Sequence, residues 1–320
     1  MNSLFKDEFN WMLRENKGYF SWLGDSSYRL LRHLTLYNGK CFHGPCGHDM
    51  PPRDVIKTIL ENNVCENKLF DLFLKSLIRA EIRFISRYIP QRSHEERLTG
   101  NLVAEIDNSI YLVKDKFREA SVELYGQPKE IDFLYYDLSR GGKIEKQTGA
   151  DLGLILVIDL PDFPYSVISY VLQAKKIDNG RASLDRRQYE TLSLNDEKSY
   201  CSYLFYDMSI RSLCAPLVVC AKNSSIKTSY EECKANNSQS FSISLEDMCH
   251  IGHPLSLFVI SHMLRDNKIG QRYSRFRDAF RDFETISESK LNFSGRLGIV
   301  SLGKPINYSI NSDHFMDIDI

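Results

Sequence analysis

Apolar positions in the first 90 residues recur at helical spacing in four segments. Residues three and four apart share one face of an α-helix, so each segment presents an apolar side for packing. Pro90 ends the region, because proline disfavours helix in the residue before it. The pattern predicts a helical N-terminal region with helices at Phe9–Leu13, Tyr28–Leu36, Val55–Leu60 and Leu69–Tyr88.

A further long helix is expected after Pro90. Ser93 is a favoured N-cap residue, and Glu96 lies three positions later in a capping-box pattern. Apolar residues then recur every three or four positions, so one side of this helix is expected to be buried. We predict a helix from about His94 into the 110s, with its buried side formed by Leu98, Leu102, Ile106 and Ile110, and further helix to about Leu124.

From residue 131 onward the apolar residues come in short runs instead. Such runs, when bounded by turn-forming residues, are typical of buried strands. Helices are still expected at Ser183–Leu192 and Leu255–Arg265, and the polar stretch Lys222–Ser240 is interpreted as a loop. This order predicts an α+β fold with a mixed central sheet flanked by helices. Its strands are expected at Ile131–Leu138, Leu152–Ile158, Val167–Leu172, Ser202–Tyr206, Ala215–Cys220 and Leu297–Leu302.

Composition and charge narrow the class of protein. The 320 residues are 42% hydrophobic and 26% charged, as in an ordinary globular protein. Lys and Arg number 41 against 42 Asp and Glu, so nucleic-acid binding would need a local basic patch. With no long apolar run, no signal-peptide pattern and eight scattered cysteines, the sequence indicates a cytoplasmic protein with reduced thiols and no membrane contact.

Candidate chemistry lies at one end of an expected hairpin. If Leu152–Ile158 and Val167–Leu172 pair antiparallel, the midpoint of Asp151 and Gln173 falls inside the Pro161–Pro164 turn. Those two residues then face each other. Side chains alternate along a strand, so Gln173 and Lys175 share a face. We therefore expect Asp151, Gln173 and Lys175 to converge.

This set of residues suits a hard divalent cation. Mg²⁺ or Mn²⁺ takes oxygen ligands, which the Asp151 carboxylate, the Gln173 amide and the Ala174 backbone carbonyl can provide. Such an ion polarises a phosphoryl group and acidifies an attacking water. Lys175 can position that water and stabilise charge on the phosphate.

These residues resemble the PD-(D/E)xK nuclease superfamily. The resemblance lies in Asp…Gln-Ala-Lys, followed by SLDRRQYETL as a helix and SYLFYD as a strand, and it covers roughly residues 93–210. Gln188 and Tyr189 stand where related nucleases carry a supporting Gln or Tyr. The segment HEERLTGNLVAEI resembles the helix that supplies an acid to the metal site. Gln173 departs from the usual acid and removes one negative charge.

Two glutamates compete for the place of the helix acid. Glu95 shares the apolar stripe of Leu98 and Leu102 and is expected to face the core. Glu96 lies about 100° away, and a capping role would explain it. Both stay in the predicted catalytic set, with Glu95 favoured as the metal ligand.

The resemblance implies a metal-dependent endonuclease acting on DNA, with RNA as the other nucleic acid to test, in restriction or phage defence. It implies a restriction-endonuclease-like core at 91–210, after a helical region at 1–90 and before a C-terminal extension at 211–320 that packs on the core. A homodimer or a partner protein of a defence complex is expected, because double-strand cutting needs two active sites. The alternatives are a catalytically inactive nuclease-fold protein that binds nucleic acid and a scaffold subunit of a larger complex.

Two other segments carry weaker predictions. Cys41, His43, Cys46 and His48 offer zinc-type ligands within eight residues, although this spacing favours a loop with reduced cysteines. Six cations with interleaved aromatic residues lie between 265 and 281, which predicts either phosphate contacts or a solvated helix face. The predicted nucleic-acid-binding residues are Lys176, Gln188, Arg272 and Arg275.

Overall fold

The computed structural model describes residues 27, 51–63, 65, 67–137, 151–194, 200–208, 215–264, 272–279, 296–310 and 316–319. The two helices predicted before residue 50 lie outside these ranges, as do Cys41, His43, Cys46 and His48. The zinc prediction therefore stays a prediction.

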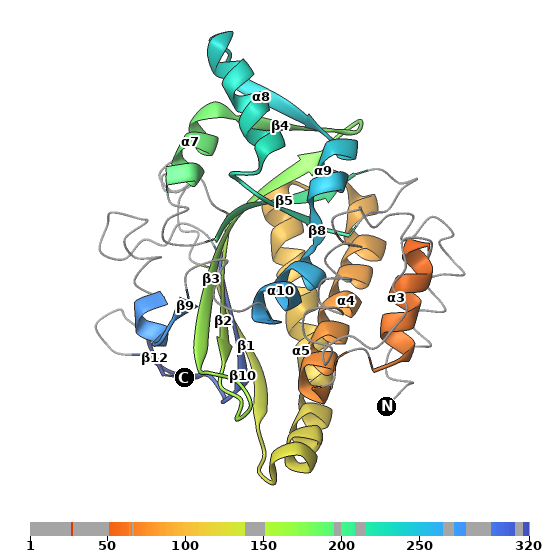
Figure 1. Cartoon of the computed structure of the whole chain (residues 1–320), viewed down its shortest axis with the longest axis vertical. Coiled ribbons are helices and arrows are strands. Elements are labelled where there is room, and N and C mark those ends of the chain that lie inside the picture. Colours follow the sequence, from red (N-terminus) through yellow and green to blue (C-terminus); the bar gives the residue numbers. More distant parts are fainter. Residues whose placement is uncertain are drawn as a thin grey trace.

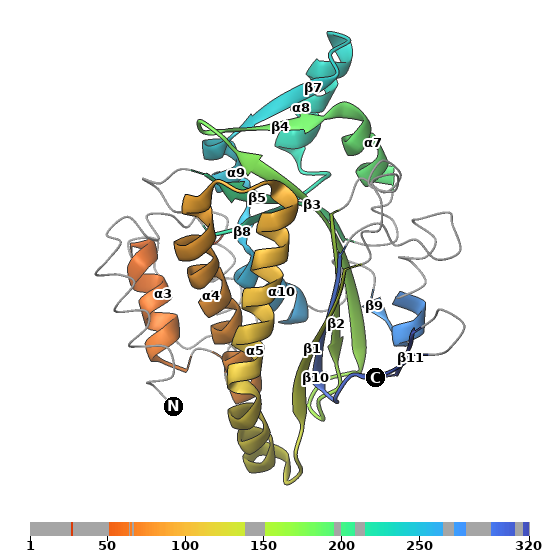
Figure 2. The ribbon, with the colours of Figure 1, turned by 180° about the vertical axis from the view of Figure 1, so that it is seen from behind.

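Helices cover one face of the central sheet (Figures 1 and 2). They confirm the predictions for Val55–Leu60, Leu69–Tyr88 and the long helix after Pro90. The long helix, α5, runs without a break for 31 residues. The helices on this side of the sheet are α4 (Lys68–Tyr88), α5 (Glu95–Tyr125) and α10 (Leu255–Leu264), and α3 (Pro52–Glu61) lies farther from the sheet, beyond α4.

The start of α5 differs from the capping-box prediction. His94 is the N-cap residue, its side chain makes no capping bond, and Glu95 and Glu96 occupy the first turn. Carboxylates in a first turn interact favourably with the positive end of the helix dipole, which offsets the missing cap. The shift of one residue places Glu95 at the first helical position.

The sheet is mixed, as predicted. Among the described residues it has eight strands, in the order β1-β10-β2-β3-β5-β6-β8, with β9 (Arg272–Tyr273) paired to β3. The β10–β2 and β3–β5 pairs are parallel, and the other pairs are antiparallel. The strands are β1 (Glu130–Asp137), β2 (Leu152–Ile158), β3 (Ser166–Ile177), β5 (Tyr200–Asp207), β6 (Leu217–Cys220), β8 (His253–Pro254) and β10 (Arg296–Gly303).

Alternation along the strands divides the core between the two faces of the sheet. In β3, Tyr170 and Leu172 pack with the helices of the first layer, whereas Val167 and Val171 pack in a second cluster on the other face. Both faces are buried, which explains the continuous apolar runs of β2 and β3 in the sequence.

Several elements that pack on the second cluster, or lie next to it in the chain, differ from the sequence prediction. The helix predicted from Ser183 begins at Arg186, because Arg181–Asp185 forms strand β4 with alternating burial. The stretch interpreted as a loop contains helix α8 (Ser224–Ala235), which Asn223 caps by accepting from Ser225 N. Also present are α7 (Arg186–Leu194), β7 (Ser240–Ser244) paired with β4, α9 (Leu245–Ile251), and the pair β11 (Asn307–Ile310) and β12 (Met316–Asp319).

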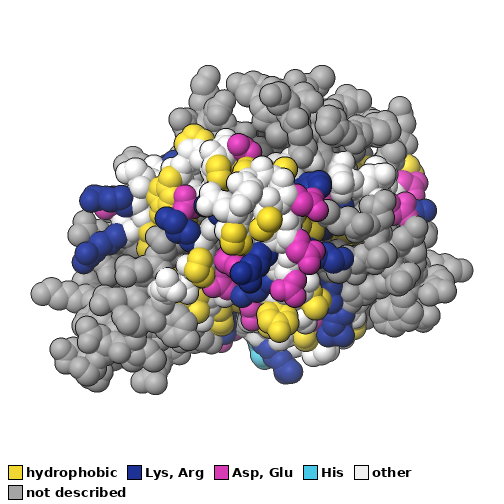
Figure 3. Space-filling model, turned by 90° about the horizontal axis from the view of Figure 1, so that it is seen from below, with side chains coloured by type: hydrophobic (Ala, Val, Ile, Leu, Met, Phe, Trp, Pro, Cys, Tyr) yellow, Lys and Arg dark blue, Asp and Glu magenta, His cyan; other side chains and the backbone are white. Residues whose placement is uncertain are grey.

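The described surface carries both charges close together. Figure 3 shows Lys and Arg side chains interspersed with Asp and Glu side chains at the end of the molecule seen from below, with small apolar areas between them. This mixture agrees with the near-zero net charge. No helix in the described ranges is long and apolar enough to cross a membrane.

Candidate metal and phosphate site

The β2–β3 hairpin has the predicted register. Leu152 pairs with Leu172 and Ile158 with Ser166, which sets Asp151 beside Gln173. Asp151 N donates to Leu172 O at 3.0 Å, so the backbone at this point is fixed. Two runs of branched residues joined by a proline turn favour this pairing, since proline starts the turn and burial on both faces fixes the register.

Beyond the end of β2, the Asp151 side chain accepts the β3 backbone hydrogen bond that a further residue of β2 would otherwise accept. Its Oδ2 accepts from Ala174 N at 2.8 Å and from Gln173 Nε2 at 2.5 Å. The Asp151 residue is 9% exposed, so these bonds lie in a nearly dry environment. A buried carboxylate needs such donors, because burial without them is costly.

Glu95 joins the same edge of β3 from the helix layer. Its Oε1 accepts from Lys176 N at 2.9 Å. Ala174 and Lys176 are two residues apart, so the bound oxygens of Asp151 and Glu95 lie roughly 7 Å apart along the strand. The carbonyl of Ala174 faces this edge as well, because a strand residue directs its N–H and C=O to the same side. Glu96 is exposed and turned to solvent.

Gln173 holds the most informative atom of the site. The residue is 1% exposed, and within the described part of the chain its Oε1 has no hydrogen-bond partner. Nε2 is already committed to Asp151 Oδ2, with a longer contact of 3.4 Å to Ala174 O. A buried amide oxygen without a donor costs free energy unless something else binds it. An oxygen-seeking cation fits this position.

The donor set that results is unusual for a metal centre. The described residues contain no group of three or more His, Cys, Asp or Glu side chains that could hold a metal. The oxygens available beside Asp151 instead belong to an amide and a backbone carbonyl. Mg²⁺ and Mn²⁺ accept both kinds of oxygen, so the residues present fit such an ion.

Lys175 lies on the face of the sheet that carries α7. Its Nζ donates to Gln188 Oε1 at 2.9 Å. Gln188 is held in turn, because its backbone N donates to Asp185 Oδ1 at 2.9 Å at the start of α7. The neighbouring Tyr189 packs in the second core, where its ring lies 4.5 Å from that of Tyr230.

A short relay that the sequence did not indicate fixes the first turn of α5. Thr99 Oγ1 donates to Glu95 O at 2.9 Å, and the Tyr206 hydroxyl is 3.0 Å from Thr99 Oγ1. Thr99 has one hydrogen to donate, so Tyr206 is the donor of the second bond. Burial raises the pKa of Tyr206 well above its usual range, and the negative charges of Asp151 and Glu95 add to this effect. The hydroxyl therefore keeps its proton.

Arg296 is a further residue that the sequence reasoning missed. Its backbone N donates to Asp151 O at 3.3 Å, and it opens β10 in parallel register with Leu152. Its Nε lies 4.0 Å from where a Cβ on Gly100 of α5 would stand. The side chain thus reaches the helix side of the sheet. The sequence signal for Arg296 was a cation directly before an apolar strand. The strand that it pairs with, β2, is distant in sequence, so this signal did not place Arg296 near Asp151.

The remaining predicted residues are divided between the two ends of the hairpin. Lys176 is half-buried beside Glu95. Arg272 pairs with Ile168 near the turn end and donates to Met263 O at 3.3 Å. Arg275 forms an ion pair with Asp278 at 2.8 Å. The structure thus brings Asp151, Gln173, Lys175, Gln188, Glu95 and Lys176 to one end of the hairpin, and it places Arg272 near the other.

The site can be summarised by its chemistry. Two carboxylates, an amide oxygen and a backbone carbonyl gather where β3 extends past β2, and Lys175 lies on one face. Hard oxygens beside a lysine suit a divalent cation and a phosphate. Comparisons with models of protein families, with curated proteins and with solved structures find no match to this chain.

Proposed function

We propose that this chain is a metal-dependent nuclease that hydrolyses phosphodiester bonds, with DNA as its substrate. The observation that carries the proposal is Gln173 Oε1, a buried oxygen without a donor that lies beside the Asp151 carboxylate. The hydrogen bond of Lys175 to Gln188 supports it, since a lysine held near a metal site is suited to phosphate chemistry.

Each residue has a role that follows from its position. Asp151, Gln173 and the Ala174 carbonyl would hold Mg²⁺ or Mn²⁺, and Glu95 would add a second negative charge from α5. When bound, the ion supplies Lewis-acid polarisation of the phosphoryl group and makes an attacking water more acidic. Lys175 orients that water and stabilises the negative charge that develops on the phosphate. Gln188 keeps the Lys175 ammonium in place.

Cleavage assays on linear and circular DNA, with and without Mg²⁺ or Mn²⁺, test the proposal. Asp151→Ala and Lys175→Ala should each lower the rate by roughly 10³-fold, because each removes a group that acts on the transition state. The matched controls are Asp162→Ala at the exposed turn and Lys227→Ala on α8, which should keep the wild-type rate. Cleavage that persists in chelator, or that both site variants retain, would contradict the assignment.

The neutral charge of Gln173 favours two alternatives without catalysis. A catalytically inactive nuclease-fold protein would bind DNA or RNA but cleave neither under any divalent ion. A scaffold subunit would neither bind nor cleave them. A role in phage defence and a homodimer follow from the superfamily resemblance and stay proposals of the same kind.

A further inference from the structure

The negative charge available to a metal at this site is small. Asp151 and Glu95 are the carboxylates bonded to this edge of β3, and Gln173 adds an oxygen but no charge. Centres that hold two divalent ions place them about 3.5–4 Å apart. At that distance two dications repel each other with four times the energy of two unit charges. Bridging and flanking acids must offset this repulsion, and this site has few.

The two carboxylates are also poorly placed to bridge two ions. Asp151 Oδ2 already accepts from Ala174 N and Gln173 Nε2, and Glu95 Oε1 accepts from Lys176 N. Their bound oxygens lie roughly 7 Å apart along the edge of β3. Each carboxylate is therefore tied to its own backbone N–H group. The geometry suits one ion near Asp151 and Gln173.

Arg296 brings a protein cation to the end of the sheet that carries Asp151. The Arg296 backbone is bonded to that of Asp151, and its Nε lies against Gly100 in the first turns of α5. The Tyr206 hydroxyl, which binds Thr99 in the same helix segment, experiences the charges of Asp151, Arg296 and Glu95 together. The Arg296 guanidinium therefore belongs to the same electrostatic environment as the two acids.

Arg296 and Lys175 approach the end of the sheet from opposite faces. Lys175 alternates with Val171 and Ile177 of the second core and contacts α7. Arg296 precedes Leu297, which lies in that second core, so its own side chain points to the helix layer. The two cations thus flank, from opposite faces, the end of the sheet where Asp151 and Glu95 bond the β3 edge. A phosphodiester bound at that edge would meet positive charge on both faces.

We propose that the site takes a single divalent cation and that Arg296 supplies the second positive charge to the substrate phosphate. The inference rests on the proposed phosphodiester hydrolysis and specifies its metal count and a phosphate-binding residue. A guanidinium is suited to this role, because it stays charged at every working pH and binds phosphate oxygens through two parallel N–H bonds.

The metal count is tested by titrating the full chain with Mn²⁺ alone and following free Mn²⁺ by electron paramagnetic resonance. We expect one Mn²⁺ per chain that is lost in Asp151→Ala, and Arg296→Gln should keep that ion with equal or a few-fold tighter binding. Two ions lost together in Asp151→Ala would overturn the single-ion inference while leaving nuclease activity intact as a proposal. No ion lost in that variant would contradict the proposed function itself.

The phosphate role of Arg296 is tested by binding of a short DNA duplex in Ca²⁺, measured by fluorescence anisotropy. Arg296→Gln should weaken binding by tenfold or more, and Arg296→Lys should recover part of the loss. The matched control is Arg118→Gln at the far end of α5, which should bind as the wild type does. Unchanged binding in Arg296→Gln, in protein whose melting temperature and Mn²⁺ uptake match the wild type, would overturn this role.

Discussion

At the scale of single residues, the chemistry of the site depends on Gln173, an uncharged amide at a position where an acid would add a negative charge. Gln173 can donate to Asp151 through Nε2 and still offer Oε1, which a carboxylate could not do in the absence of metal. The amide therefore lets the site fold without a cation and remain able to accept one. A glutamate would bring two buried carboxylates together, and one of them would have to be neutralised.

Gln173→Glu tests this reasoning. Without metal, the variant should lose on the order of 1–3 kcal/mol of unfolding free energy, because the bond to Asp151 is replaced by repulsion. With saturating Mn²⁺ it should recover more stability than the wild type gains, since the ion now meets an additional charge. Thermal unfolding with and without Mn²⁺ measures both effects, and Gln127→Glu on the exposed end beyond α5 is the control. A variant as stable as the wild type without metal would argue against the contact.

Glu81 carries a separate pH dependence in the helix layer. Its carboxylate accepts from Ser256 N at 2.9 Å and from Ser256 Oγ at 2.6 Å at the start of α10. Burial raises the pKa of Glu81 from its ordinary 4.5 to about 7. Between those two pH values the folded chain holds a proton that the unfolded chain releases, so the stability from this group is lost as the pH rises from 4.5 to 7.

Glu81→Gln should remove this slope, because the amide is an uncharged isostere that can still bond both groups of Ser256. Relative to the variant, the wild type should lose roughly 2–3 kcal/mol of unfolding free energy between about pH 5 and 8. Chemical denaturation at intervals across that range provides the comparison. Parallel stability curves for the two proteins would mean that Glu81 does not titrate in this window.

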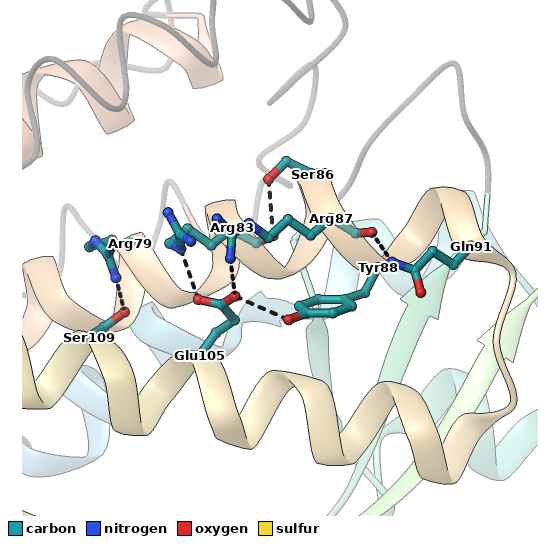
Figure 4. Close-up of polar contacts among 8 residues, drawn as sticks. All are labelled: Arg79, Arg83, Ser86, Arg87, Tyr88, Gln91, Glu105 and Ser109. Atoms are coloured by element: carbon teal, nitrogen blue, oxygen red, sulfur yellow. Dashed lines mark hydrogen bonds and ion pairs between the residues drawn. The ribbon is translucent and has the colours of Figure 1, made fainter.

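At the scale of elements, α4 and α5 are joined by a polar contact as well as by their apolar stripes. Figure 4 shows the Glu105 carboxylate of α5 facing a row of α4 side chains. Arg83 Nε donates to it at 2.9 Å, Arg87 Nη1 at 3.3 Å, and the Tyr88 hydroxyl at 3.4 Å. The Glu105 side chain is 4% exposed, so this contact fixes the register of the helix that carries Glu95.

Glu105→Gln should therefore destabilise the chain. Breaking a buried ion pair from one side costs about 3–5 kcal/mol, and here Arg83 would lose the carboxylate that faces it. The exposed Glu119→Gln, also on α5, is a matched control and should stay within about 0.5 kcal/mol of the wild type. Urea denaturation of both variants gives the difference. An equal, small effect in the two would show that the arginines are satisfied without Glu105.

Local patterns predicted most elements of the fold, and the errors have local causes. The hairpin register followed from two apolar runs of fixed length around a proline turn, because a shift by one residue would reverse every side chain. The local pattern predicts the start of a helix where the structure has strand β4, since the pairing partner β7 lies far along the chain. It predicts a loop where the structure has helix α8, because the polar residues of α8 are good caps and weak helix formers.

At the scale of the whole molecule, the site depends on a strand that no local pattern could position. β10 comes from near the end of the chain, yet it lies between β1 and β2 and pairs with both. Its first residue, Arg296, thereby meets Asp151. Sequence reasoning predicted this strand as an element and found the Asp151, Gln173 and Lys175 set. It could not predict the strand order. It therefore could not predict that Arg296 would lie beside Asp151 on the helix side of the sheet.

A crystal soaked in Mn²⁺ and examined by anomalous diffraction tests the central claim most directly. The account predicts one ion within about 2.5 Å of an Asp151 carboxylate oxygen and of Gln173 Oε1, since oxygen ligands bind such ions at that range. The Gln173 side chain should keep its buried position. Saturating Mn²⁺ that leaves Gln173 Oε1 without a neighbouring ion would contradict the metal-dependent nuclease proposed for this chain.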